Sequence, residues 1–170
     1  MRSATTTRAK GVALAPPLAA MLLGLFALLP ASANGGEVAF SARISGSAAF
    51  TSPTSVEFDG AGTATHLGKF ATAGAAVLGA PTELCPGGVL GIPNVHTETL
   101  TAADGDQLVI RMVNVGCPTG PFTFRGTGHW SVLSGTGRFE GVAGRGVNEG
   151  NADFATSTFE LVLTGRLLRP

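Results

Sequence analysis

Apolar and polar residues alternate along most of the chain beyond residue 36, with the period of two that half-buried β-strands show. In the first such stretch Val38, Phe40 and Ile44 fall on one face, while Ser41 and Arg43 fall on the other. The alternation recurs and predicts eight strands, at residues 37–45, 55–66, 70–78, 96–102, 107–115, 122–133, 138–147 and 153–166. The domain is therefore expected to be all-β.

The segments between the predicted strands are mostly short and rich in turn-forming residues. Asp104-Gly105 separates two alternating runs, which is a strong hairpin signal. Further turns are expected at residues 134–137 and 148–151, and a long loop rich in Gly and Pro at residues 79–94. Neighbouring strands joined in this way pair antiparallel, so eight of them close most simply into an up-and-down barrel. A two-sheet β-sandwich is the alternative.

Glycines recur at alternate positions in two of the predicted strands. Gly60 and Gly62 share one face of their strand, and Gly126 and Gly128 share one face of theirs. Missing side chains at such positions let a sheet coil sharply, as a small closed barrel requires. The glycine pattern therefore favours the barrel over the sandwich.

The N-terminal segment follows a different pattern. Three basic residues and no acidic residue precede an apolar stretch at residues 12–29, which ends in a small-x-small sequence at residues 31–33. This order is typical of a secretory signal peptide. A retained membrane anchor is the alternative, but a spanning helix needs roughly 20 apolar residues, and Pro16-Pro17 interrupts this stretch.

We therefore expect a helical signal peptide at residues 1–33 and a single β-barrel domain at residues 34–170, secreted or periplasmic. The chain has 11 basic and 11 acidic residues, but three basic ones lie in the signal peptide, so the domain has a net charge of about −3. A mildly acidic surface with scattered charges argues against a nucleic-acid or anionic-membrane partner. After cleavage the domain has no apolar run long enough for a membrane helix.

Cys85 and Cys117 are the only two cysteines in the chain. An isolated pair in an oxidising compartment normally forms one disulfide. Both lie in predicted turns rich in Pro and Gly, so the bond would tie two loops together. Two free thiols, or a metal pair, are the alternatives, but two thiolates without histidines at ligand spacing make a poor zinc site.

Sequence patterns that carry common catalytic chemistry are missing from the predicted domain. It has no Gly-x-Ser-x-Gly for a serine nucleophile, and no phosphate-binding or dinucleotide-binding Gly-rich sequence. His66, His96 and His129 are dispersed, with no metal-ligand spacing. We therefore assign no catalytic residue, no metal ligand and no cofactor, and favour a role other than catalysis.

Two residues are candidates for ligand contact inside a barrel. His66 is in phase with Val56 and Phe58, so it would bind a ligand if that face lines the interior; the alternative is an exposed turn histidine. Trp130 is in phase with Phe122 and Phe124, and is either a core residue or one wall of a pocket.

One run of the sequence resembles a known group of barrels. Residues 135–144 read Gly-Thr-Gly-Arg-Phe-Glu-Gly-Val-Ala-Gly, which resembles the Gly-Thr-Gly-basic-Phe-x-x-Ala-x-Gly segment of dirigent proteins and the allene oxide cyclase-like barrel group. Residues 62–70 and 102–108 are similar to stretches of secreted bacterial proteins of comparable size. The resemblance implies an eight-stranded antiparallel barrel. Its matched residues are turn and scaffold residues, so it assigns no catalytic residue.

Three functions are consistent with these observations. The first is a non-catalytic exported barrel that binds a small apolar ligand or acts as an interaction module, because eight strands enclose just enough space for one small ligand. The second, implied by the resemblance, is a cyclase-like protein or one that guides coupling of radicals. The third is a structural, surface-associated homo-oligomer, because the predicted strand at residues 107–115 is apolar on both faces.

Overall fold

The computed structural model describes residues 36–169, so the predicted signal peptide at residues 1–33 lies outside the described residues. Between residues 36 and 169 the chain forms nine strands and one short 3₁₀ helix, η1. The elements are β1 (Glu37–Ser52), β2 (Ser55–Ala64), β3 (Gly68–Leu78), β4 (Glu83–Leu84), β5 (Leu90–Ala102), β6 (Gln107–Pro118), β7 (Thr123–Gly135), η1 (Gly137–Phe139), β8 (Ala143–Asp153) and β9 (Thr158–Leu168).

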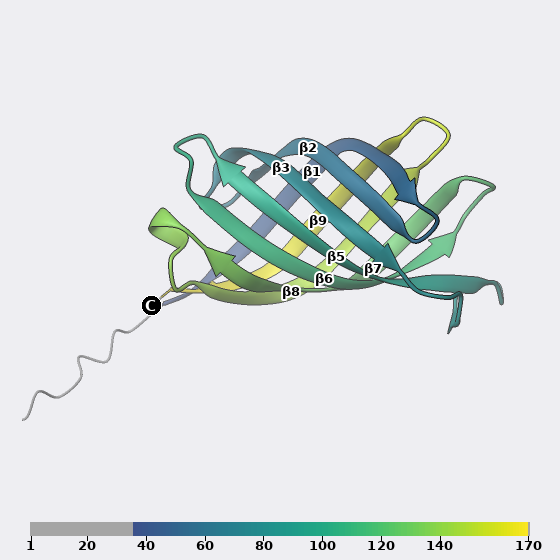
Figure 1. The fold of residues 1–170 in the computed structure, drawn as a ribbon. Helices are drawn as coiled ribbons and strands as arrows, with labels where there is room; N and C mark the ends of the chain where they lie inside the picture. Colours follow the sequence, from purple (N-terminus) through teal and green to yellow (C-terminus); the bar gives the residue numbers. More distant parts are fainter. Residues whose placement is uncertain (1–35, 170) are drawn as a thin grey trace, which may run out of the picture. The chain divides into compact units, whose positions relative to one another are not determined.

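The long strands run up and down around a closed barrel (Figure 1). Each pairs antiparallel with its neighbour in sequence, β3 pairs with β5 past the two-residue β4, and β9 returns to pair with β1. The short β4 forms a separate hairpin with the start of β5. The predicted eight-stranded antiparallel up-and-down barrel is confirmed, with β4 as an additional strand, and the alternative β-sandwich is wrong.

One end of the barrel is filled with apolar side chains, and we call it the closed half. It carries the connections β2–β3, β5–β6 and β7–β8, the last of which contains η1. Its buried side chains are Phe40, Leu67, Phe70, Leu100, Leu108, Ile110, Trp130, Phe139, Val142 and Leu167. Inner residues alternate with outer ones along each strand, so the side chains on strands converge from all sides. Leu67, Phe139 and Val142 enter this core from the connections.

Trp130 lies inside this core and is 2% exposed. Its ring packs edge-on against Phe40, with 5.2 Å between the centroids, and its Nε1 donates a hydrogen bond to the carbonyl oxygen of Thr164 at 3.2 Å. Gly146 and Gly165 are paired across β8 and β9 next to the indole, and a Cβ atom at either would lie within 2.7 Å of it. The two glycines therefore provide the space that the indole occupies.

The predicted strand at residues 138–147 is wrong over its first part, because η1 occupies residues 137–139 and β8 begins only at Ala143. Phe139 and Val142 are both buried in the closed half. In an extended strand, residues three apart would point to opposite faces. The 3₁₀ turn lets both side chains enter the barrel.

The predicted turn at residues 148–151 is also wrong. β8 continues through it, and the turn lies at residues 154–157. Asparagine and glycine are typical turn residues, but Asn148 is buried within the barrel. The observed turn is stabilised instead by the Asp153 carboxylate, which accepts a hydrogen bond from the backbone N–H of Ala155 at 2.9 Å.

The predicted loop at residues 79–94 is shorter than expected, because the last five of these residues belong to β5 and two more form β4. Within it, Cys85 is bonded to Cys117 near the end of β6, with 5.8 Å between the Cα atoms. The predicted disulfide is confirmed. It joins the β4–β5 hairpin to the neighbouring part of the barrel rim.

Candidate functional site

The end of the barrel opposite the closed half contains a cavity of about 130 Å³, and we call this end the open half. It carries the connections at residues 53–54, 79–89, 119–122 and 154–157. The cavity lies on the inner faces of the barrel strands, and its lining is mostly apolar. The main lining side chains are Phe50, Val56, Phe58, Ala76, Leu78, Ile92, Phe124, Ala152, Phe154, Phe159 and Leu161.

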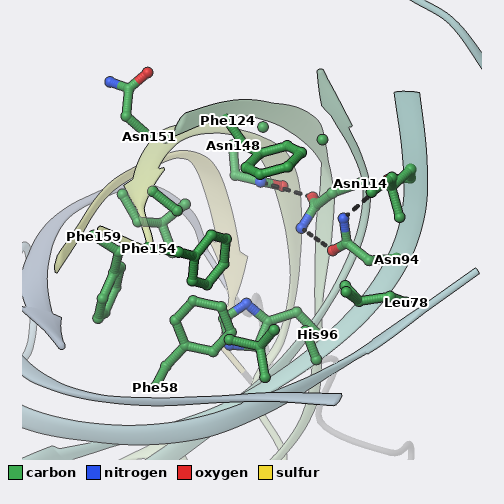
Figure 2. Close-up of a pocket in the computed structure, with 18 of the residues that line it drawn as sticks. Phe58, Leu78, Asn94, His96, Asn114, Phe124, Asn148, Asn151, Phe154 and Phe159 are labelled. Atoms are coloured by element: carbon green, nitrogen blue, oxygen red, sulfur yellow. Dashed lines mark hydrogen bonds between the residues drawn. The ribbon is translucent and has the colours of Figure 1, made fainter. Parts of the chain in front are cut away.

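Aromatic rings form the base of the cavity (Figure 2). Phe58 stacks on the imidazole of His96, with 4.4 Å between ring centroids, and meets Phe159 edge-on at 5.1 Å. Nearer the rim, Phe154 packs against Phe50 at 4.5 Å and against Phe124 at 5.8 Å. A ligand in this cavity would therefore contact aromatic faces and edges on several sides.

Two glycines leave the cavity open on one wall. A Cβ atom built at Gly126 on β7 would have no heavy atom within 4 Å. At Gly116 on β6, its nearest neighbours would lie at 3.7 and 3.8 Å, which is ordinary contact. These two positions are paired across the sheet. The space is therefore created by missing side chains, and a larger residue would fill it without a backbone clash.

Three asparagine side chains form a row along another part of the wall (Figure 2). Asn148 Nδ2 donates to Asn114 Oδ1 at 2.8 Å, and Asn114 Nδ2 donates to Asn94 Oδ1 at 3.3 Å. Gly128 on β7 separates Asn114 from Asn148, and a Cβ atom there would clash with the Asn114 side chain. Glycine at this position therefore allows β6 and β8 to be bridged across β7.

His96 and Glu98 on β5 add two ionisable groups to the interior. Glu98 is fully buried, and its Oε1 accepts a hydrogen bond from Thr72 Oγ1 at 2.5 Å. Its Oε2 lies 3.0 Å from His96 Nε2, but neither atom has a hydrogen-bond partner among the described residues. His96 borders the cavity, and Glu98 and Thr72 lie behind it.

The structure separates the two residues that the sequence analysis selected for ligand contact. His66 lies in the turn after β2, where it is exposed and its Nε2 is 3.0 Å from the carbonyl oxygen of Ala39. Its φ of 69° interrupts the alternation of β2, so it does not follow Val56 into the interior. Trp130 is a core residue of the closed half and is not among the residues that line the cavity.

The sequence pattern did not lead us to the polar residues of the cavity, although the positions of some of them indicate that they are buried. His96 and Glu98 are in phase with the apolar Leu100, and Asn114 is in phase with Ile110. A polar residue in phase with apolar ones is expected on the buried face of a strand. Asn148 had no such signal, because its in-phase neighbours on both sides are glycines.

Residues 36–169 also bear on metal binding and on membrane insertion. No group of three or more His, Cys, Asp or Glu side chains in this range is placed to hold a metal ion. No helix in this range has the length and apolar character needed to cross a membrane. Comparisons of the chain with protein-family models, with curated proteins and with solved structures gave no match.

Proposed function

We propose that this protein binds one small, largely apolar molecule in the open half of the barrel. The observation that carries the proposal is the cavity, which is bordered by aromatic rings and left empty by two glycines. An apolar pocket with a few convergent polar groups is the usual form of a small-molecule site.

The volume limits the size of this ligand. Pockets for drug-sized molecules measure about 300–1,000 Å³, whereas an apolar cavity of about 150 Å³ accepts benzene. At about 130 Å³, the cavity has room for one six-membered ring or the end of a short chain. A longer ligand would extend through the barrel mouth.

Filling the cavity tests the proposal. Toluene is titrated into the full chain, and saturable shifts of backbone amide resonances in the open half are measured by NMR. Gly126→Leu is expected to abolish them, because the new side chain enters the open space. Thr127→Leu is the control, since it places the same side chain on the exposed outer face of the same strand.

The proposal is contradicted if toluene gives no saturable shifts up to its solubility limit. Equal affinity for the wild-type protein and for Gly126→Leu would also contradict it, because binding would then occur outside the cavity.

We also propose that the protein is secreted or periplasmic. The disulfide between Cys85 and Cys117 is compatible with an oxidising compartment, and the N-terminal pattern supports export. The mass of the protein recovered from outside the cytoplasm tests this: it should correspond to residues 34–170 less two hydrogen atoms. A mass that includes residues 1–33 would contradict cleavage.

A cyclase-like or coupling-guiding activity, as the resemblance to dirigent and allene oxide cyclase-like proteins implies, is the second candidate. It is favoured by His96, which borders the cavity with a buried carboxylate behind it. A positioned imidazole is the group most often used to transfer protons in catalysis. A ligand recovered chemically unchanged after long incubation with the protein would count against this candidate.

A structural, oligomeric role is the third candidate, and the outer face of the barrel favours it. Val77, Val95 and Val113 are paired in a row across β3, β5 and β6, and Val77 and Val113 are 63% and 49% exposed. Exposed apolar patches mark interaction sites when they are contiguous. Light scattering at high protein concentration tests this role, and a monomer there would contradict it.

A further inference from the structure

The row of three asparagines has a fixed direction. It begins at Asn94, whose Nδ2 donates to the carbonyl oxygen of Ile92 at 3.4 Å. A backbone carbonyl can only accept a hydrogen bond, so the NH₂ group of Asn94 must face it and its Oδ1 must face Asn114. The same reasoning then orients Asn114 and, through it, Asn148, whose Nδ2 donates to Asn114 Oδ1.

This orientation leaves an acceptor at the end of the row. Asn148 is 5% exposed and borders the cavity, and its Oδ1 is buried without a hydrogen-bond partner among the described residues. An amide oxygen can accept two hydrogen bonds and cannot donate any. Leaving a buried acceptor without a donor is costly, so a buried amide oxygen in a native protein usually accepts a hydrogen bond from the protein, from water or from a ligand.

The charges around the cavity restrict the partner further. None of the described residues that line it is a lysine or an arginine. The acidic residues near it are Glu160, an exposed residue of β9 that belongs to the lining, and the buried Glu98 beside His96. A carboxylate or phosphate on a ligand would therefore lose its water without gaining a cation. The site does not suit an anion.

Building on the proposed function, we propose that the ligand is a neutral molecule whose buried end carries a hydrogen-bond donor, such as an alcohol hydroxyl or an amide N–H, directed at Asn148 Oδ1. In this arrangement Asn94 is a positioning residue. It acts on the ligand's donor only through Asn114 and Asn148. Its role is to hold the amide of Asn148 so that the oxygen, and not the nitrogen, faces the ligand.

Three probes that share a cyclohexane ring and differ in their polar group test the inference. Cyclohexanol can donate a hydrogen bond, cyclohexanone can only accept one, and cyclohexanecarboxylate is an anion. Dissociation constants are measured by NMR titration of the full chain. Cyclohexanol is expected to bind about tenfold more tightly than cyclohexanone, because the ketone leaves Asn148 Oδ1 unpaired and brings a second acceptor to it. The carboxylate is expected to bind most weakly.

Asn94→Leu tests the positioning role. Without Asn94, both remaining amides are free to turn over, so the ratio of the cyclohexanone and cyclohexanol dissociation constants should fall towards one. Thr97→Leu, on the exposed outer face of the same strand, should leave the ratio unchanged. If the ratio of the two dissociation constants is unchanged in Asn94→Leu, Asn94 does not position Asn148 and the proposed role is wrong.

The outcomes separate this inference from the proposed function. If cyclohexanol and cyclohexanone bind the wild-type protein equally while toluene also binds, the cavity is a ligand site but the donor inference is wrong, as when an ordered water satisfies Asn148. If no probe binds, including toluene, the proposed function fails and the inference fails with it.

Discussion

The closed and open halves share the same eight barrel strands but fill their interiors differently. In the closed half, the inner positions hold large apolar side chains such as Trp130, Phe139 and Leu108, all nearly inaccessible to solvent. In the open half, the inner positions of β6 and β7 include Gly116 and Gly126, and the neighbouring amide of Asn148 replaces an apolar side chain. The barrel framework is continuous between the two (Figure 1).

This difference indicates where stability and binding reside. A barrel of eight strands has an interior that side chains can just fill, so small residues at a few inner positions are enough to create a cavity. The packed closed half is expected to supply most of the hydrophobic free energy of folding. The open half is then free to keep empty space and polar groups that a core would not contain.

Truncating one leucine in each half should have the largest effect on the free energy of unfolding, and should show the difference between the halves most clearly. Leu108 is fully buried in the closed half, whereas Leu161 borders the cavity. Leu108→Ala is expected to lower the free energy of unfolding by about 3–5 kcal/mol, and Leu161→Ala by roughly half as much, because Leu161 has fewer packing partners to lose. Urea denaturation measures both. Equal losses would contradict the contrast between the halves.

Removing the disulfide should have the next largest effect on the free energy of unfolding, and its local effect should be confined to the open half. Cys85 and Cys117 are 32 residues apart in sequence, and closing a loop of this length stabilises by about 3–4 kcal/mol on the chain-entropy estimate. The double variant Cys85→Ser, Cys117→Ser should lose this amount in urea denaturation. Hydrogen exchange should increase near the β4–β5 hairpin, and not around η1. An increase around η1 alone would contradict a local role.

Removing the hydroxyl group that supports Glu98 should have a smaller effect. Thr72→Val keeps the shape of the side chain but leaves Glu98 Oε1 without its hydrogen-bond donor. We expect a loss of about 1–3 kcal/mol in unfolding free energy. Thr97→Val, at an exposed outer position on β5, should change it by less than about 0.5 kcal/mol. A neutral result for Thr72→Val would mean that Glu98 does not depend on this bond.

The smallest effect on stability is expected at the surface of the closed half, where Asp104 contacts Arg138 of η1. Desolvation raises the pKa of Asp104, but the backbone N–H of Asp106 and the Arg138 guanidinium outweigh it and lower the pKa below the usual 3.8. A lowered folded-state pKa stabilises the fold above pH 3.8, and this stabilisation disappears as the pH falls through the folded-state pKa.

Asp104→Asn should therefore be slightly less stable than the wild-type protein at pH 7, and the difference should vanish in acid. Thermal unfolding of both proteins between pH 7 and pH 2 measures this. A difference that grows towards low pH would contradict the assigned direction of the shift.

The sequence predicted the barrel because its evidence was local and repeated. Alternation and turn residues located most strands, and the isolated pair Cys85 and Cys117 predicted the disulfide. The predictions were wrong where a residue occurs in an element that is not typical of its residue type or of the surrounding alternation. Its residue type predicts a turn at Asn148, which lies on an inner strand face, and the alternation predicts a strand at Phe139, which enters the barrel from a 3₁₀ turn.

The candidate site was less predictable because it depends on contacts between distant strands. Asn114 and Asn148 are 34 residues apart in sequence and meet only across Gly128. Period-two alternation predicts which face of a strand a residue occupies, but not its position along the barrel axis relative to residues of other strands. His66 was selected as being in phase with the inner face, and one residue with positive φ was enough to remove it.

A crystal structure determined under xenon pressure tests the central claim most directly, because xenon enters apolar cavities that stay free of water. The account predicts a xenon atom in the open half, between Phe58, Phe159 and Gly126, and none in the closed half. Side chains that fill this space and exclude xenon, or xenon bound instead beside Trp130, would contradict the division of the barrel into a packed half and a binding half.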